Sequence, residues 1–160
     1  MSIMENVNAL RTGIFAGKMM VAALAGEGRV GRIVMRVLIC GGRDYQDRRG
    51  VFAALDRLHA KRGIGCVIHG GAAGADFLAG AWADERGITT ATFPADWSTH
   101  GLAAGPLRNQ QMIDEGKPDG VIAFPGGAGT ADMVERARRA GVTVWEPAGK
   151  GGGGFDELSG

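Results

Sequence analysis

The sequence predicts a Rossmann-like α/β fold, in which a mainly parallel sheet of about five strands lies between two layers of helices. Two observations support this three-layer αβα prediction. Short apolar segments of strand length recur between residues 35 and 147, and segments with helical spacing of apolar residues separate them. Glycine-rich links follow several of the strand-like segments. This alternation is typical of parallel strands joined by crossover helices, with helices on both faces of the sheet.

Five segments have the length and composition of strands. They are, in chain order, Arg36–Cys40, Cys66–His69, Thr89–Phe93, Gly120–Phe124 and Val142–Trp145. In a parallel sheet the carboxyl ends of the strands meet at one edge, and ligands of doubly wound folds bind there. The loops that follow these segments are therefore where we expect the functional residues.

Helical segments are expected between the strands, because apolar residues recur there at spacings of three and four. The expected apolar stripes are Val51, Phe52, Leu55 and Leu58; Phe77, Leu78, Ala81 and Trp82; a mixed stripe of Leu107, Gln111, Met112 and Glu115; and Met133, Val134 and Ala137. Each stripe should pack on the sheet.

One domain is expected, since the 160 residues with 45% hydrophobic content suffice for one core. We assign the domain to residues 35–147. Residues 1–34 are an N-terminal extension, interpreted as a helical segment, an oligomer contact or the product of an over-long start-codon assignment before Met35. Its apolar run, Ile14–Ala25, is too short to span a membrane. Residues 148–160 are rich in glycine and expected to be flexible.

Charge and cysteine content exclude several classes of protein. The 18 basic and 17 acidic residues give a net charge of +1, which provides no general attraction for nucleic acid or membrane. Cys40 ends one strand and Cys66 begins the next, so we expect no disulfide between them. Free cysteines in turn indicate a cytoplasmic location. His69 and His100 lack the spacing of a metal-ligand pair, and we expect no metal and no required cofactor.

Two glycine-rich turns carry the strongest functional signal. The segment FPGGAGTADMVE, at 124–135, closes one strand and opens a helix at Thr130; HGGAAGAD, at 69–76, repeats this arrangement after an earlier strand. Glycine lets the backbone approach an anion closely, and the first helical turn offers N–H groups without internal partners. The two turns together predict a site for the phosphate of a nucleotide-like ligand.

Two further loops reach the same edge. GGRDY, at 41–45, contains Arg43, which is expected to pair either with a phosphate or with Asp44 or another loop carboxylate. The loop at 94–109 contains Trp97, a candidate for base stacking that is alternatively expected to cover the sheet edge. It also contains Arg108, a cation early in a helix, where the dipole disfavours it.

Each candidate has a structural alternative. The glycines of both turns are also compatible with tight strand-to-helix turns, and Thr130 with a helix cap. Asp76 is compatible with a first-turn aspartate as well as a ribose ligand. The candidate ligand-binding residues are Gly41, Gly42, Arg43, Gly70, Gly71, Gly74, Asp76, Arg108, Asn109, Pro125, Gly126, Gly127, Gly129 and Thr130.

The four loop motifs together resemble the SLOG superfamily, most closely its YspA/cpYpsA-related branch. The resemblance covers roughly residues 35–147 and implies a Rossmann-like fold that binds nucleotides or nucleotide-derived molecules. The superfamily includes cytokinin-activating phosphoribohydrolases, which split nucleoside monophosphates, and the DNA-processing protein A family, which binds single-stranded DNA. Relatives of this fold commonly pair, so a homodimer is expected.

The chain departs from the phosphoribohydrolase motif PGGxGTxxE, because Met133 stands at the position of the glutamate that assists departure of the base. Asp132 is the candidate catalytic substitute; alternatively, it only complements the helix dipole. Glu135 is expected to point away, since each helical residue adds about 100° of rotation. Arg108 resembles the arginine that partners the family glutamate.

Three functions follow as alternatives. The leading hypothesis is a sensor or binding module for a nucleotide derivative such as AMP, ADP-ribose or an NAD-like dinucleotide. The second is an N-glycosidic hydrolase with Arg108 and Asp132 as catalytic residues. The third is a single-stranded DNA binder, against which the near-neutral charge argues.

Overall fold

The computed structural model describes residues 34–148, which form a five-stranded sheet with helices on both faces and confirm the predicted fold class. The expected N-terminal extension, apart from Val34, and the expected tail, apart from Ala148, lie outside the described residues. The strands are β1 (Met35–Cys40), β2 (Ile64–His69), β3 (Thr89–Thr92), β4 (Gly120–Ala123) and β5 (Thr143–Trp145). The helical elements are α3 (Arg48–Arg62), α4 (Ala75–Glu85), α5 (Trp97–His100), the 3-10 helix η1 (Gly101–Ala103), α6 (Ala104–Asp114) and α7 (Ala128–Arg139).

The strand order is β3-β2-β1-β4-β5, and every neighbouring pair is parallel. The chain builds outward from β1 to β3 and then crosses to β4 on the other side of β1. Cys40 is opposite Ala123, and His69 is opposite Thr92, so these strands end together at one edge. The loops after β1 and β4 diverge there, which is the arrangement that opens a ligand crevice in doubly wound sheets.

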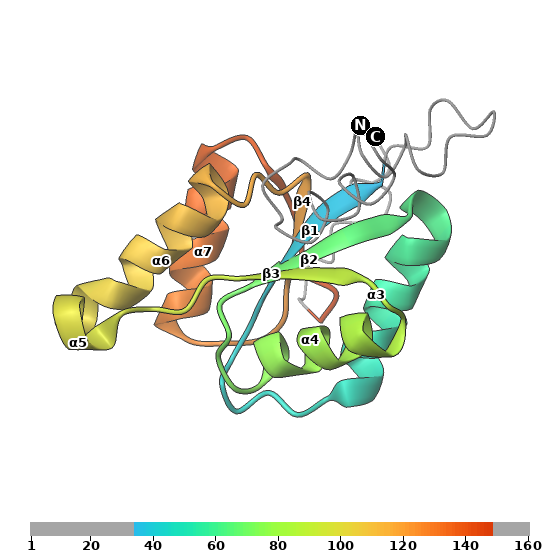
Figure 1. Cartoon of the computed structure of the whole chain (residues 1–160), viewed down its shortest axis with the longest axis horizontal. Helices are drawn as coiled ribbons and strands as arrows, with labels where there is room; N and C mark the ends of the chain where they lie inside the picture. Colours follow the sequence, from blue (N-terminus) through green and yellow to red (C-terminus); the bar gives the residue numbers. More distant parts are fainter. Residues whose placement is uncertain (1–33, 149–160) are drawn as a thin grey trace, which may run out of the picture. The chain divides into compact units, whose positions relative to one another are not determined.

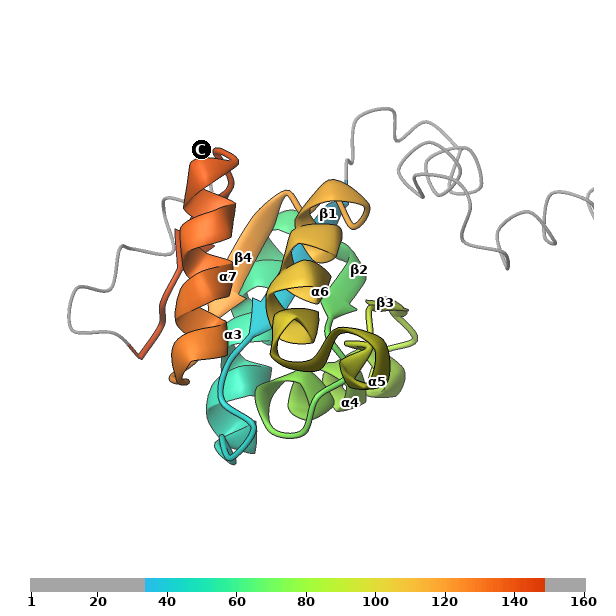
Figure 2. The ribbon, with the colours of Figure 1, turned by 90° about the vertical axis from the view of Figure 1, so that its left-hand side faces the viewer.

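Alternate residues of the strands point to opposite faces of the sheet and belong to two separate hydrophobic cores. In β1, Val37 and Ile39 pack against α3 and α4, whereas Leu38 and Cys40 pack against α6 and α7. Figure 1 shows these two helix pairs on opposite sides of the sheet, and Figure 2 shows α6 and α7 side by side on one face. A parallel sheet that is covered on both faces explains why its strands are almost continuously apolar.

The predicted apolar stripes are right for α3 and α7 and partly wrong for α4 and α6. In α4, Phe77 is 68% exposed, and the buried face beside Trp82 consists mainly of alanines. In α6, Leu107 is 51% exposed, while Met112 and Ile113 are buried. Small residues let α4 lie close to the sheet, so side-chain size is a poor guide to its buried face.

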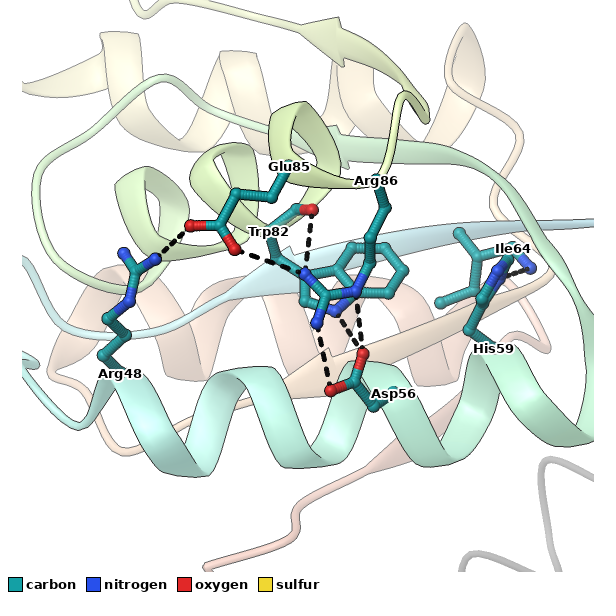
Figure 3. Close-up of polar contacts among 7 residues, drawn as sticks. All are labelled: Arg48, Asp56, His59, Ile64, Trp82, Glu85 and Arg86. Carbon is teal, nitrogen blue, oxygen red and sulfur yellow. Dashed lines mark hydrogen bonds and ion pairs between the residues drawn. The ribbon is translucent and has the colours of Figure 1, made fainter.

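Side-chain contacts join α3 to α4 on the outer surface (Figure 3). The Arg86 guanidinium donates to both carboxylate oxygens of Asp56, at 2.9 and 3.1 Å. The Trp82 indole N–H donates to the same carboxylate at 2.8 Å, and Arg48 pairs with Glu85. These contacts hold the two helices in register at a distance from the strand ends.

The segment expected to be a loop after β3 is largely helical. It contains α5, η1 and the first turns of α6. Asp96 begins α5 by accepting hydrogen bonds from the Thr99 amide and the Ser98 hydroxyl, at 3.0 and 2.8 Å. None of the helices in residues 34–148 combines the length and apolar character that crossing a bilayer requires.

Candidate nucleotide-binding site

A cavity of about 670 Å³ lies at the carboxyl edge of the sheet, and all four strand-end loops contribute to it. Its volume is typical of small-molecule sites, which measure roughly 300–1,000 Å³. The lining comprises Ile39–Asp44, Ala72, Asp76, Trp97, Leu102, Gly105, Pro106, Arg108, Asn109, Met112, Gly127–Thr130 and Asp132. The predicted convergence of the four loops is therefore present.

The loop after β1 lies between its two neighbours. The Gly42 amide donates to the Pro125 carbonyl at 2.8 Å, and the Gly42 carbonyl accepts from the Ala75 amide at 3.2 Å. A Cβ at Gly41 would lie 2.6 Å from that of Ala75. These two glycines line the cavity, and the close packing of the three loops also requires them.

The loop between β2 and α4 uses its amides internally. The buried Asp76 carboxylate accepts from the Gly70 and Ala72 amides at 3.0 and 3.2 Å, and the His69 Nδ1 accepts from the Gly71 amide at 3.0 Å. With the Ala75 amide bound to Gly42, no amide among Gly70, Gly71, Ala72 and Ala75 is left for an anion.

Burial dominates the ionisation of the two side chains that organise this loop. It lowers the pKa of His69, although the charges of Asp76 and Asp84 act in the opposite direction. Burial likewise raises the pKa of Asp76, against the hydrogen bonds from Ala72 and Gly70 and the positive charge of Arg108. A neutral His69 keeps Nδ1 as an acceptor, which the bond from Gly71 requires.

The loop between β4 and α7 has the opposite character. Within residues 34–148, the amides of Gly126, Gly127, Ala128, Gly129 and Thr130 donate no hydrogen bond, and the first helical bond runs from the Ala131 amide to the Gly127 carbonyl at 3.1 Å. The helix begins at Ala128, two residues before the expected start, and the hydroxyl of Thr130 does not cap it. Five consecutive amides are therefore free to bind an anion.

Two glycines of this loop have no structural requirement for lacking a side chain. A Cβ added at Gly127 or Gly129 would meet no atom within 4 Å, and neither residue has a positive φ. Gly126 differs, because its Cβ would lie 2.1 Å from the Thr130 hydroxyl oxygen. Gly127 and Gly129 thus leave room at the cavity wall rather than within the protein.

Arg108 joins the loops across the cavity. Its guanidinium donates to the Gly70 carbonyl at 2.9 Å and to the Asn109 side-chain oxygen at 3.2 Å. Burial lowers the pKa of Arg108, the charge of Asp76 raises it, and the charge of Arg43 lowers it again. Arg108 and Arg43 together place two guanidinium groups on the cavity wall.

Trp97 lines the cavity and is 45% exposed. The Arg43 guanidinium carbon lies 5.2 Å from the centroid of its ring, within the range of a cation–π contact. Among residues 34–148, Arg43 forms no ion pair with Asp44 or with another loop carboxylate, the protein partners considered for it. Trp97 lines the cavity at the edge where the strands end, which is compatible both with base stacking and with covering that edge.

Asp132 lines the same cavity, and Met133 does not. Asp132 accepts from the Asn109 amide group at 2.9 Å and from the Arg136 guanidinium at 2.8 Å. Met133 is fully buried in the core beneath α7. Glu135 pairs with Arg139 on the exposed side of the helix, as its rotation from Met133 implies.

Cys40 also lines the cavity, and its thiol is poorly suited to act as a nucleophile because the thiolate is the reactive form. Burial, with added repulsion from Asp76 and Glu146, raises the pKa of its thiol to about 12. Cys40 and Cys66 are both free, and Cys66 pairs with Arg36 at the opposite end of β1. The expectation that no disulfide joins them is confirmed.

The remaining predicted residues surround the cavity without all facing it. Pro125 and Gly126 line a second cavity of about 740 Å³ on the other side of the β4–α7 loop, and Gly127 and Thr130 line both. Gly70 and Gly71 line a smaller hollow of about 260 Å³ with Arg43, Trp97 and Arg108. Gly74 lines none of these three.

Sequence reasoning missed Arg136, and it proposed Asn109 as a ligand-binding residue without the contacts that Asn109 makes. Arg136 positions Asp132, and its spacing of four residues along one helix was the available signal. Asn109 also donates to the Gly129 carbonyl at 3.1 Å, a contact between two helices that no local pattern indicates. Among residues 34–148, no group of three His, Cys, Asp or Glu side chains is placed to hold a metal ion.

Comparisons with known proteins agree with this architecture. The model of the YspA, cpYpsA-related SLOG family matches residues 35–100, from β1 through α5. The Gene 61 protein of Mycobacterium phage D29 is 42% identical over 117 residues, which cover 68% of this chain and 93% of the phage protein. The chain belongs to the YspA, cpYpsA-related SLOG family.

Proposed function

We propose that the cavity binds a nucleotide or nucleotide-derived ligand, such as AMP, ADP-ribose or an NAD-like molecule, and that the protein acts as a sensor or binding module. The observation that carries this proposal is the row of five unpaired amides from Gly126 to Thr130. An anion at the start of α7 would accept hydrogen bonds from these amides and would be stabilised by the positive end of the helix dipole.

The electrostatics of the loop support a phosphate as that anion. The first turn of α7 contains no acidic side chain, so nothing of the protein competes for its amides. Arg43 and Arg108 both line the same cavity. A guanidinium donates charge-assisted hydrogen bonds to phosphate oxygens, which makes both arginines candidates for binding the phosphate or pyrophosphate.

Trp97 supports a planar group as the other end of the ligand. Its half-exposed ring lines the cavity, as does the apolar side chain of Leu102, which is 93% exposed. Aromatic rings stack on bases, and displacement of Arg43 from the ring would free that face. The cavity volume accommodates a nucleotide.

N-glycosidic hydrolysis is the second candidate, because Asp132 and Arg108 line the same cavity. Any monophosphate that binds should be incubated with the protein and assayed for free base and ribose 5-phosphate. Replacement of Arg108 with Ala should abolish turnover if the cavity is catalytic, whereas an unchanged rate would exclude this mechanism.

The binding proposal is tested by thermal unfolding of the full chain with AMP, ADP, ADP-ribose and NAD, and with adenosine as a control without phosphate. A ligand at 100 times its dissociation constant adds about 2.7 kcal/mol of stability. This raises the midpoint by several degrees in a domain of this size. We expect at least one phosphate-containing compound to do so and adenosine to have little effect.

The matched variant is Gly127→Asp, which gives α7 a carboxylate at its N-cap position. That carboxylate should bind the helix amides itself and repel phosphate, so the unliganded midpoint should stay or rise while the ligand-induced shift is lost. Gln46→Glu, an exposed position outside the cavity, introduces the same charge and should retain the shift. No shift with any compound, from folded wild-type protein, would refute the proposal.

A further inference from the structure

Asp132 has one carboxylate oxygen occupied and one free. Oδ2 accepts from the Asn109 side-chain amide at 2.9 Å and from the Arg136 Nε at 2.8 Å. No hydrogen bond within residues 34–148 uses Oδ1. The same Asn109 amide donates to the Gly129 carbonyl at 3.1 Å, so the carboxylate is held against the first turn of α7.

The carboxylate is an acceptor in its prevailing state. Burial raises the pKa of Asp132, but the hydrogen bonds from Arg136 and Asn109 and the charges of Arg136 and Arg139 outweigh it and lower the pKa overall. An ionised carboxylate has no proton to donate. Asp132 is therefore suited to receive a hydrogen bond from a ligand and unsuited to protonate a departing base at neutral pH.

The position of Asp132 determines which part of a ligand it meets. Asp132 follows Ala128 by four residues, so both lie on one face of α7, about 6 Å apart along the helix axis. A second anionic group would be repelled there. A neutral group with hydroxyl donors, a few bonds away from a phosphate, satisfies both the free amides and the free carboxylate oxygen.

We propose that Asp132 Oδ1 accepts a hydrogen bond from the ring hydroxyls of a ribose whose phosphate lies on the amides of residues 126–130. This inference rests on the proposed function and narrows its ligand to ribonucleotides and their derivatives. Asn109 and Arg136 are positioning residues, because they occupy Oδ2 and turn the other oxygen to the ligand.

The test compares ribonucleotides with their deoxy forms. Binding of AMP, GMP, CMP and UMP, of the matching 2′-deoxy and 3′-deoxy monophosphates, and of inorganic phosphate is measured by calorimetry on the full chain. We expect at least one ribonucleotide to bind tenfold or more tightly than its deoxy counterpart. Asp132→Ala should reduce this preference to less than twofold while leaving the affinity for the deoxy form within threefold of wild type.

Two further variants keep the result interpretable. Asp132→Asn retains the shape of the side chain but exchanges a charged acceptor for a neutral one, so it should fold even if Asp132→Ala does not, and should weaken the preference. Glu135→Gln removes a carboxylate of the same helix that faces the other cavity and should change nothing.

The outcomes separate the two proposals. Equal binding of ribo and deoxy forms, or a preference that survives both Asp132 variants, overturns the role of Asp132 and leaves phosphate binding standing. Failure of every nucleotide and of inorganic phosphate to bind the wild-type protein overturns the proposed function, and this inference with it.

Discussion

The two glycine-rich loops of this protein look alike in sequence and differ in what their amides do. In the β2–α4 loop, the amides of Gly70, Gly71 and Ala72 bind Asp76 or His69. In the β4–α7 loop, the five amides from Gly126 to Thr130 bind nothing within residues 34–148. The first loop is a wall of the site, and the second is the part of it that is open to an anion.

The glycines of the two loops are needed for different reasons. Gly71 and Gly74 have φ of +70° and +76°, a region that other residues rarely adopt. Gly127 and Gly129 have ordinary backbone angles and open space where a Cβ would be. A glycine-rich turn after a strand therefore indicates either a demanding backbone or a ligand, and only the surroundings distinguish these.

The largest effect on stability is expected at Gly74. In Gly74→Ala, the new Cβ would lie 2.1 Å from the Gly42 carbonyl oxygen, at a φ that strains alanine. Strain and overpacking together should cost about 2–5 kcal/mol. Urea denaturation measures this loss, and a cost below 0.5 kcal/mol would mean that the loop relaxes freely and would weaken the contrast between the two loops.

Asp76→Ala should have the next largest effect. It leaves the Gly70 and Ala72 amides without their acceptor, and an unsatisfied buried donor costs about 1–3 kcal/mol. We expect a loss of about 2 kcal/mol in the free energy of unfolding. The exposed Asp44→Ala, on the opposite wall, serves as the control and should cost far less; equal losses would show that Asp76 does not organise its loop.

The pH dependence of stability provides a smaller effect in the same loop. Because burial lowers the pKa of His69 below 6.5, the unfolded chain takes up this proton first as the pH falls. The stability contributed by neutral His69 is thus complete above about pH 6.5 and is lost progressively as the pH falls from there toward the lower pKa of the folded state.

Comparison of wild type with His69→Gln isolates this contribution, because the pKa of Asp76 shifts in the opposite direction and its effect is present in both proteins. Urea denaturation at about pH 7.5 and about pH 5 should show the decline in wild type and less of it in the variant. Identical pH profiles would mean that His69 does not titrate differently on folding.

The smallest effect on stability is expected at Gly129. In Gly129→Ala, the methyl group enters open space on a helix, where alanine is favoured over glycine by about 0.5–1 kcal/mol. Urea denaturation should show stability that is unchanged or slightly raised, while the thermal shift by a bound nucleotide should fall. A clear loss of stability would show that the structure requires glycine at position 129 as it does at Gly74, and would contradict the difference between the loops.

Much of the fold was predictable because it depends on local patterns. The apolar segments located all five strands to within two residues at each end, and the strand–helix alternation predicted parallel pairing. The stripe predicted for α7 was right because Met133 and Val134, two of its three buried residues, carry a clear hydrophobic signal. The stripe for α4 was partly wrong because alanines, which carry little hydrophobic signal, form its buried face.

The candidate site was predictable as a set of loops but not as an arrangement of side chains. The sequence placed Arg43, Trp97 and Arg108 at the edge where the cavity lies. It did not predict which side chains Asp132 and Met133 would contact, one in the cavity and the other in the core. Nor did it indicate that Asn109 connects Arg108 to Asp132. Those contacts join helices that are separated by the whole of β4.

The sequence by itself determined the fold class, the edge of the sheet where the candidate site lies, and the two glycine-rich loops that were candidates for binding an anion. These depend on residue spacing and on the backbone freedom of glycine, both of which are local. Only the tertiary structure decided which of the two loops has backbone amides without an acceptor in the protein. The Ala75 amide finds its acceptor at Gly42, and Gly70 meets Arg108, through contacts between distant segments. Whether a hydrogen-bond donor is satisfied depends on every neighbour in space, and a chain read in order does not specify those neighbours.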